Sequence, residues 1–95
     1  MKSRELYCPI CNYKYEGKRF RTKHHLFPRY WYHSGVVVYA CAICHTYEFH
    51  KMFPMNLNKV WTRSECIQNW VKFCKIKGRN AYIIYPKLMD LSSLN

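Results

Sequence analysis

Two cysteine pairs with identical spacing constrain this chain more than any other feature. Segments 8–11 (CPIC) and 41–44 (CAIC) are separated by 29 residues. A C-x-x-C turn presents two sulfurs to one side of a metal ion, so two such turns can complete the tetrahedral coordination that structural zinc prefers. A chain of 95 residues has a small core, and zinc binding contributes on the order of 10 kcal/mol to the folding of such units. We therefore predict a structural Zn²⁺ bound by Cys8, Cys11, Cys41 and Cys44.

The cysteine count also bears on the compartment. Six cysteines would suit a secreted disulfide scaffold, but four of them fall into C-x-x-C pairs and the first residues, MKSREL, do not read as a signal peptide. We expect an intracellular protein in a reducing compartment, the cytoplasm or the nucleus, and not a secreted one. The alternative interpretation is that the two C-x-x-C segments are unrelated pairs of buried thiols. Cys66 and Cys74 recur at helical spacing on an apolar face, and we interpret both as core residues.

Charge points to a class of partner. Lys and Arg number 16 against 5 Asp and Glu, which gives a formal net charge of +11. Such a balance favours polyanions, and nucleic acid above all, as partners. A hydrophobic fraction of 49% with 18% aromatic residues argues against disorder. No apolar run approaches the ~18 residues that span a bilayer, so we expect no membrane partner.

The pattern of elements predicts one α+β domain over residues 1–95, with a core at about 7–54 and a C-terminal helical extension at about 62–95. Thr62 and Glu65 fit a capping box at the start of a helix, and Gly78 fits its end. In chain order we expect a strand at 18–23, a strand at 36–41, about three helical turns at 43–53, a helix to about Lys77, and a short strand or extended segment at 81–86.

Histidines flank the cysteine motifs. His24 and His25 close the first predicted strand, where adjacent side chains point to opposite faces. His45 directly follows Cys44 and can complete a metal site with His24. A neutral imidazole is also a suitable base near pH 7. A lone histidine is more often a core or surface residue, but the clustering here favours metal binding or catalysis.

The order C-x-x-C, strand, H-H-x-x-P, loop, strand, C-x-x-C-H, helix resembles the HNH endonucleases, which combine a ββα-metal core with a four-cysteine zinc site. The resemblance covers roughly residues 8–54. It implies that His24 and His45 bind a catalytic divalent metal (Mg²⁺, Mn²⁺, Ni²⁺ or Zn²⁺) and that His25 is the general base. The implied activity is hydrolysis of DNA phosphodiester bonds, in which the metal neutralises a phosphate oxygen and the leaving 3′ oxygen.

The sequence departs from the family pattern at two positions. Val36 stands where the family usually has the Asn that holds the loop orienting the base, and His33 or Ser34 is the nearest substitute. The final histidine of many members lies four residues after the helical one, whereas His50 lies five after His45. On an α-helix that spacing places the two side chains about 140° apart instead of ~40°. His50 stays a candidate ligand.

Cations surround the predicted site. Solvated faces are the ordinary explanation of such residues, but the net charge favours phosphate contacts. A nucleic-acid-binding zinc-ribbon module that does not cut is the rival interpretation, and a protein–protein module is a third. The predicted nucleic-acid-binding residues are Lys18, Arg19, Arg21, Lys23, Arg29, Lys72, Lys75 and Arg79.

Overall fold

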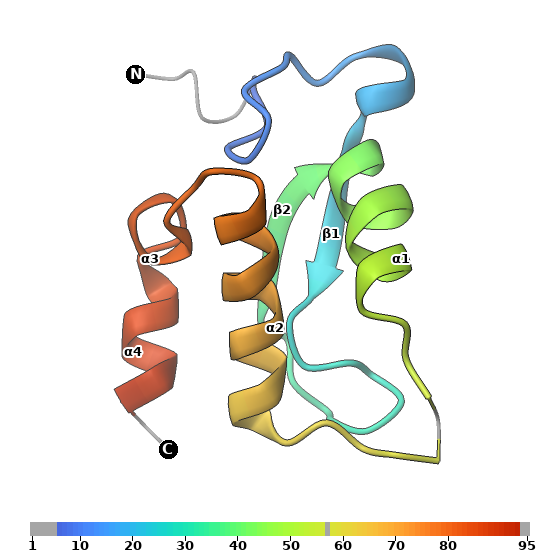
Figure 1. Ribbon diagram of the computed structural model, residues 1–95, viewed down its shortest axis with the longest axis vertical. Helices are drawn as coiled ribbons and strands as arrows, with labels where there is room; N and C mark the ends of the chain where they lie inside the picture. Colours follow the sequence, from blue (N-terminus) through green and yellow to red (C-terminus); the bar gives the residue numbers. More distant parts are fainter. Residues whose placement is uncertain (1–5, 57, 94–95) are drawn as a thin grey trace.

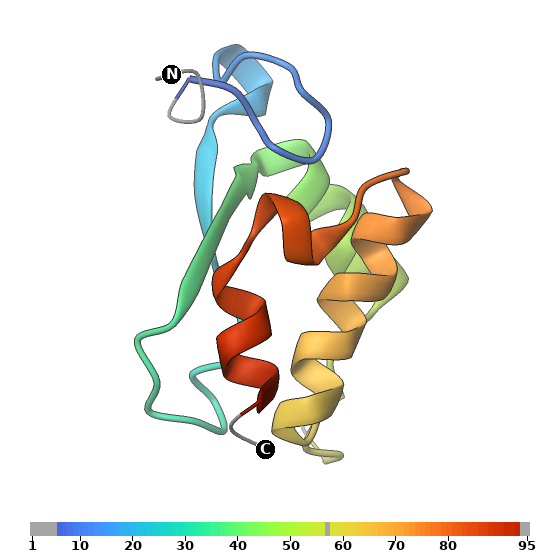
Figure 2. The same ribbon diagram turned by 90° about the vertical axis from the view of Figure 1, so that its left-hand side faces the viewer.

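A two-stranded antiparallel sheet and the helices packed on one of its faces form the centre of the molecule (Figures 1 and 2). The computed structural model describes residues 6–56 and 58–93. Their fold is small and mixed α/β, and among them no helix is both long and apolar enough to cross a membrane. The elements are η2 (Gly17–Arg19), β1 (Arg21–His25), β2 (Val37–Cys41), η3 (Ile43–Phe49), α1 (His50–Met52), α2 (Arg63–Ile76), α3 (Ala81–Ile84) and α4 (Lys87–Ser93).

The sheet register sorts the residues of β1 into two faces. Thr22 pairs with Ala40 and His24 with Val38, and the inner face that they share is packed against the core. The predicted strand at 18–23 was displaced: residues 18 and 19 belong to the short 3₁₀ turn η2, and β1 extends instead through His25. Gly17, with φ of +56°, supplies the left-handed residue that begins this turn.

The predicted helix at 43–53 is present, but its first part is a π-helix. Segment η3 covers Ile43–Phe49 and continues into α1. The backbone N–H of His50 donates to the carbonyl of His45, the i→i+5 bond that defines this form. Phe49 is buried and packs against Trp70 and Phe73 of α2, with ring centroids 4.8 and 5.4 Å apart.

Helix α2 confirms its predicted signals. The Thr62 hydroxyl accepts from the Glu65 N–H at 3.1 Å, and the Glu65 carboxylate accepts from the Thr62 N–H at 2.8 Å. Gly78, at φ of +80°, follows the helix end. Cys66 and Cys74 are buried on the apolar face, as expected of core residues.

The prediction of a short strand or extended segment at 81–86 was wrong for its first four residues, because these form α3. The Asn80 side chain accepts from the Tyr82 N–H at 3.0 Å and caps the turn, which outweighs the β propensity of the aliphatic and aromatic residues that follow. The chain after it covers the outer edge of β2. The Tyr85 hydroxyl donates to the Tyr39 carbonyl at 2.5 Å, and Lys87 Nζ donates to the Val37 carbonyl at 2.9 Å.

Candidate metal centres

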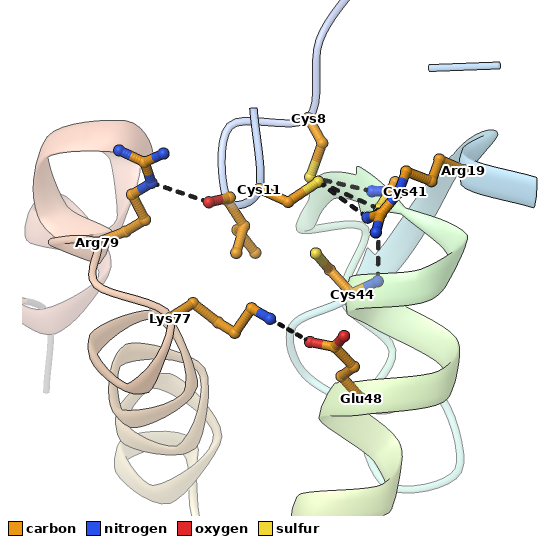
Figure 3. Close-up of polar contacts among 9 residues, drawn as sticks. Cys8, Cys11, Arg19, Cys41, Cys44, Glu48, Lys77 and Arg79 are labelled. Carbon is orange, nitrogen blue, oxygen red and sulfur yellow. Dashed lines mark hydrogen bonds and ion pairs between the residues drawn. The ribbon is translucent and has the colours of Figure 1, made fainter. Parts of the chain in front are cut away.

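The four predicted cysteines come together at the end of the sheet, from the N-terminal turn and from the junction of β2 with η3 (Figure 3). Their sulfur atoms all lie within 4.8 Å of one another. Tetrahedral zinc at ~2.3 Å from each sulfur requires sulfurs about 3.8 Å apart, and the Cys11 and Cys41 sulfurs are 3.7 Å apart. Cys8, Cys41 and Cys44 are fully buried. This cluster can hold a structural zinc ion.

Backbone hydrogen bonds to two of the sulfurs, those of Cys8 and Cys41, favour the thiolate form that zinc requires. The backbone N–H of Cys41 donates to Cys8 Sγ at 3.3 Å, and that of Cys44 donates to Cys41 Sγ at 3.4 Å. A hydrogen bond from the Cys44 thiol lowers the pKa of Cys8 to about 5, and holding that proton raises the pKa of Cys44. Four thiolates on one Zn²⁺ carry a net charge of −2, so a neighbouring cation stabilises the site.

Arg19 supplies that cation. Its Nη1 lies 3.3 Å from Cys11 Sγ and 3.7 Å from Cys41 Sγ (Figure 3). Its guanidinium lies over the Tyr13 ring, 4.4 Å from the ring centroid. Arg79 also serves the fold, since its Nε donates to the Ile10 carbonyl at 2.9 Å and ties the first cysteine turn to the segment after α2. Both arginines were predicted to bind nucleic acid, and that role stays a prediction.

A second cluster consists of three histidines from three elements. His24 of β1, His45 of η3 and His50 of α1 place their ring nitrogens within 4.8 Å of one another. His45 Nε2 is 3.3 Å from His24 Nδ1 and 3.1 Å from His50 Nε2. Ligand nitrogens at ~2.05 Å from a tetrahedral ion would be about 3.3 Å apart. The structure therefore brings His50 into the cluster, although an α-helix would have turned it away.

Thr22 fixes which nitrogen of His45 faces this cluster. The Thr22 hydroxyl has one proton, and it donates to the Ala40 carbonyl at 2.7 Å. Its oxygen, 2.9 Å from His45 Nδ1, must then accept a hydrogen bond from the Nδ1–H of that ring. In the neutral ring Nε2 then carries no proton, and this unprotonated nitrogen is the one that faces His24 and His50. This is the arrangement in which a second partner orients a metal-binding imidazole.

The surroundings keep the three rings neutral. His24 is only 4% exposed, and its ring stacks on Trp70 with centroids 4.3 Å apart and an interplanar angle of 18°. Burial, with repulsion from the neighbouring histidines, holds the pKa of His24 well below its usual value. Burial and repulsion from His50 and His25 likewise lower the pKa of His45 to about 4. His50 is exposed, so the cluster is reached from its side.

His25 lies outside this cluster, on the opposite face of β1, yet near enough for its charge to lower the pKa of His24 and His45. It lines an open cleft of about 500 Å³ together with Arg29, Tyr32 and the loop 33–35. Within that loop the Ser34 hydroxyl accepts from the Val36 N–H at 3.2 Å. The predicted base and a cation therefore share one cleft.

The remaining cations differ in whether their side chains contact other residues or are exposed to solvent. Arg21 lies over the Tyr39 ring, with its guanidinium carbon 3.8 Å from the ring centroid. Lys77 pairs with Glu48 at 2.6 Å (Figure 3). The predicted nucleic-acid-binding residues whose side chains are exposed are Lys18, Arg21, Lys23, Arg29, Lys72 and Lys75.

Thr22 and Trp70 complete the histidine site and were not predicted. Thr22 alternates with His24 along β1, which gives a weak signal that both face inward. Trp70 was assigned to an apolar helix face, but no local pattern pairs it with a histidine 46 positions earlier. Comparison with protein-family profiles, curated protein sequences and solved structures finds no significant match to this chain.

Proposed function

We propose that this chain is a divalent-metal-dependent endonuclease with an HNH-like ββα-metal core, and that it hydrolyses DNA phosphodiester bonds. The observation that carries the proposal is the spacing of His24, His45 and His50, whose nitrogens lie as far apart as ligands of one metal ion. The chain order of strand, strand and helix around them fits the same interpretation.

The donor set suits a metal centre that works on a substrate. Three neutral imidazoles, one of them oriented by Thr22, leave at least one coordination position open. A four-cysteine site has no such position, which assigns the structural role to the cysteines. A divalent ion bound by the histidines would act as a Lewis acid on a phosphate oxygen and on the leaving 3′ oxygen.

His25 is the proposed general base. Its imidazole accepts a proton from water while the water oxygen forms a bond to phosphorus, and the bond from phosphorus to the 3′ oxygen breaks. The leaving 3′ oxygen takes a proton from solvent water. The products are a 5′-phosphate and a 3′-hydroxyl. Arg29 lines the same cleft, and we propose that it binds the phosphate that reacts. Ser34, through its bond to the Val36 N–H, is proposed to hold the loop that the family's Asn usually holds.

DNA affinity is expected to come mainly from phosphate contacts. Lys23 lies on the outer sheet face, and Lys72 and Lys75 are exposed on α2. Neither of these two lysines has an ion-pair partner among the described residues. Backbone contacts of this kind carry little sequence information, so we propose modest sequence preference.

Plasmid cleavage tests the proposal. Zinc-loaded protein is incubated with supercoiled plasmid and added Mg²⁺, Mn²⁺ or Ni²⁺, or with no added metal, beside His25→Ala. We expect metal-dependent nicking, and a loss of ~10²–10⁴-fold in His25→Ala with DNA binding and zinc content retained. Tight binding with no cleavage under any metal would select the alternative, a catalytically weak or inactive zinc-ribbon nucleic-acid-binding module. Cleavage by His25→Ala at the wild-type rate would show that another group is the base.

A further inference from the structure

A second cavity, lined by none of the clustered cysteines or histidines, lies between the first cysteine turn, β2 and the segment that carries α3 and α4. Its volume is about 530 Å³, in the range of small-molecule sites. The sheet register separates it from the histidine cluster. Arg21 and Tyr39, which line the cavity, occupy outward-facing positions, whereas His24 faces inward. Figure 2 shows α4 running beside β2 on this side of the molecule.

The cations of the cavity are held in place by the fold with donors to spare. The Arg21 guanidinium carbon lies 3.8 Å from the centroid of the Tyr39 ring, Arg79 Nε donates to the Ile10 carbonyl, and Lys87 Nζ donates to the Val37 carbonyl. Arginine has five N–H donors and lysine three, so each of these groups keeps donors that are not used by its contact with the fold. No acidic residue is among the described residues that line the cavity. The cavity thus presents three positive charges, which favour an anionic ligand. Because contacts with the fold already restrict these side chains, binding a ligand costs them less conformational entropy.

The same walls offer flat aromatic surfaces. Tyr7 lines the cavity with its side chain 40% exposed, and Tyr15 and Tyr85 contribute further rings. The Arg21 guanidinium, which also lines the cavity, is a further planar group of the kind on which bases stack. A ligand that combines a planar ring with a phosphate matches both properties of the cavity.

We infer that this cavity binds a nucleotide, with its base stacked against Tyr7 and Arg21 and its phosphate bound by Lys87 and Arg79. The nucleotide is either free or one unit of a single strand, since the recognised chemistry is the same. The inference goes beyond the proposed hydrolysis and does not depend on it, because the two sites use different residues.

The test is a binding titration with zinc-loaded protein and no added divalent metal. The probes are dAMP, observed by calorimetry, and a fluorescein-labelled five-nucleotide single strand, observed by polarisation. Tyr7→Ala should weaken binding about tenfold, since base–aromatic stacking is typically worth ~1–3 kcal/mol, and Tyr7→Phe should stay within about twofold. Lys87→Gln should weaken binding several-fold more than Lys72→Gln. The second variant is the matched control, because it removes one charge from an exposed position on α2.

The outcomes distinguish a free nucleotide from a nucleotide within a strand as the ligand, and this cavity from the proposed nuclease site. Saturable dAMP binding that these variants weaken identifies a free-nucleotide site, and binding of the strand alone with the same variant pattern identifies a strand-binding site. Absence of saturable binding for both probes overturns the inference. Equal effects of Lys87→Gln and Lys72→Gln, or no effect of Tyr7→Ala, also overturn it. His25→Ala should bind both probes like the wild type, so a failed nuclease assay leaves this result standing.

Discussion

His50 lies one π-helical turn beyond His45, and the Nε2 atoms of the two rings are 3.1 Å apart. Five residues separate them, a spacing that would place their side chains on different faces of an α-helix. The i→i+5 bond from the His50 N–H to the His45 carbonyl closes the wider turn and realigns them. The π-helix therefore recovers the geometry that a four-residue spacing gives on an α-helix.

Removing one residue from η3 should keep the side chains of His45 and His50 aligned, but on an α-helix instead of a π-helix. Deletion of Tyr47, which is 67% exposed, reduces the spacing from five residues to four and allows an ordinary α-helix. We expect that variant to fold with equal or greater thermal stability and to keep the histidine metal site. Insertion of one alanine after Thr46 should abolish the site, because a six-residue spacing aligns on neither helix. Calorimetric titration with Co²⁺ checks both, and loss of binding in the deletion variant would contradict the helical account.

Thr22 should control metal affinity without contacting the metal. Thr22→Val keeps the shape of the side chain but removes the oxygen that accepts from His45 Nδ1, so the tautomer of His45 is no longer fixed. We expect affinity for the histidine-site metal to fall ~10–100-fold and unfolding free energy to fall by about 1 kcal/mol. Thr22→Ser should behave like the wild type. Equal affinity of the Val and Ser variants, measured by competition with a coloured chelator, would show that the hydroxyl has no such role.

The four-cysteine cluster, the presence of two strands and the boundaries of α2 could be predicted from the sequence, because these features depend on local signals. Paired cysteines, a β-branched run and the Thr62–Glu65 box each specify a local geometry. The π-helix could not be predicted, since its cost is offset by the packing of Phe49 against Trp70, a contact between distant segments. The contacts of Arg19 and Arg79 depend on the same long-range geometry, and a cation in the sequence does not reveal its partner.

The six thiols should be unreactive in the zinc-loaded protein. Zinc would occupy four of them, and burial raises the pKa of Cys66 to about 11 and of Cys74 to about 12, so both remain protonated at pH 8. We expect no rapid reaction with an aromatic disulfide reagent at that pH, and reaction of all six once a strong chelator removes zinc and unfolds the chain. Metal analysis on the same sample should give one tightly held zinc per chain. Soluble, folded protein without zinc would contradict the structural role of the cysteines.

DNA binding should weaken with salt in proportion to the phosphates contacted. We expect a slope of the log of affinity against log salt near −0.9 per phosphate, with roughly 4–7 phosphates neutralised. Lys72→Gln with Lys75→Gln should flatten that slope by about 2 for unrelated duplexes alike. Arg79→Gln should instead lower thermal stability, since it removes the bond to the Ile10 carbonyl. A near-zero slope, or a preference above about a thousandfold for one duplex, would show that phosphate contacts do not dominate.

Metal occupancy of the histidine cluster tests the central claim most directly. Zinc-loaded protein is titrated with Co²⁺ while the visible absorption of the ion is followed, beside His45→Ala, His50→Ala and the control His33→Ala, a histidine outside the cluster. We predict one additional equivalent of Co²⁺ in the wild type and in His33→Ala, and none in His45→Ala, with zinc content unchanged in all. His50→Ala should bind more weakly, having lost one of three ligands. A wild-type protein that binds no second ion, or His45→Ala binding as tightly as the wild type, would contradict the account.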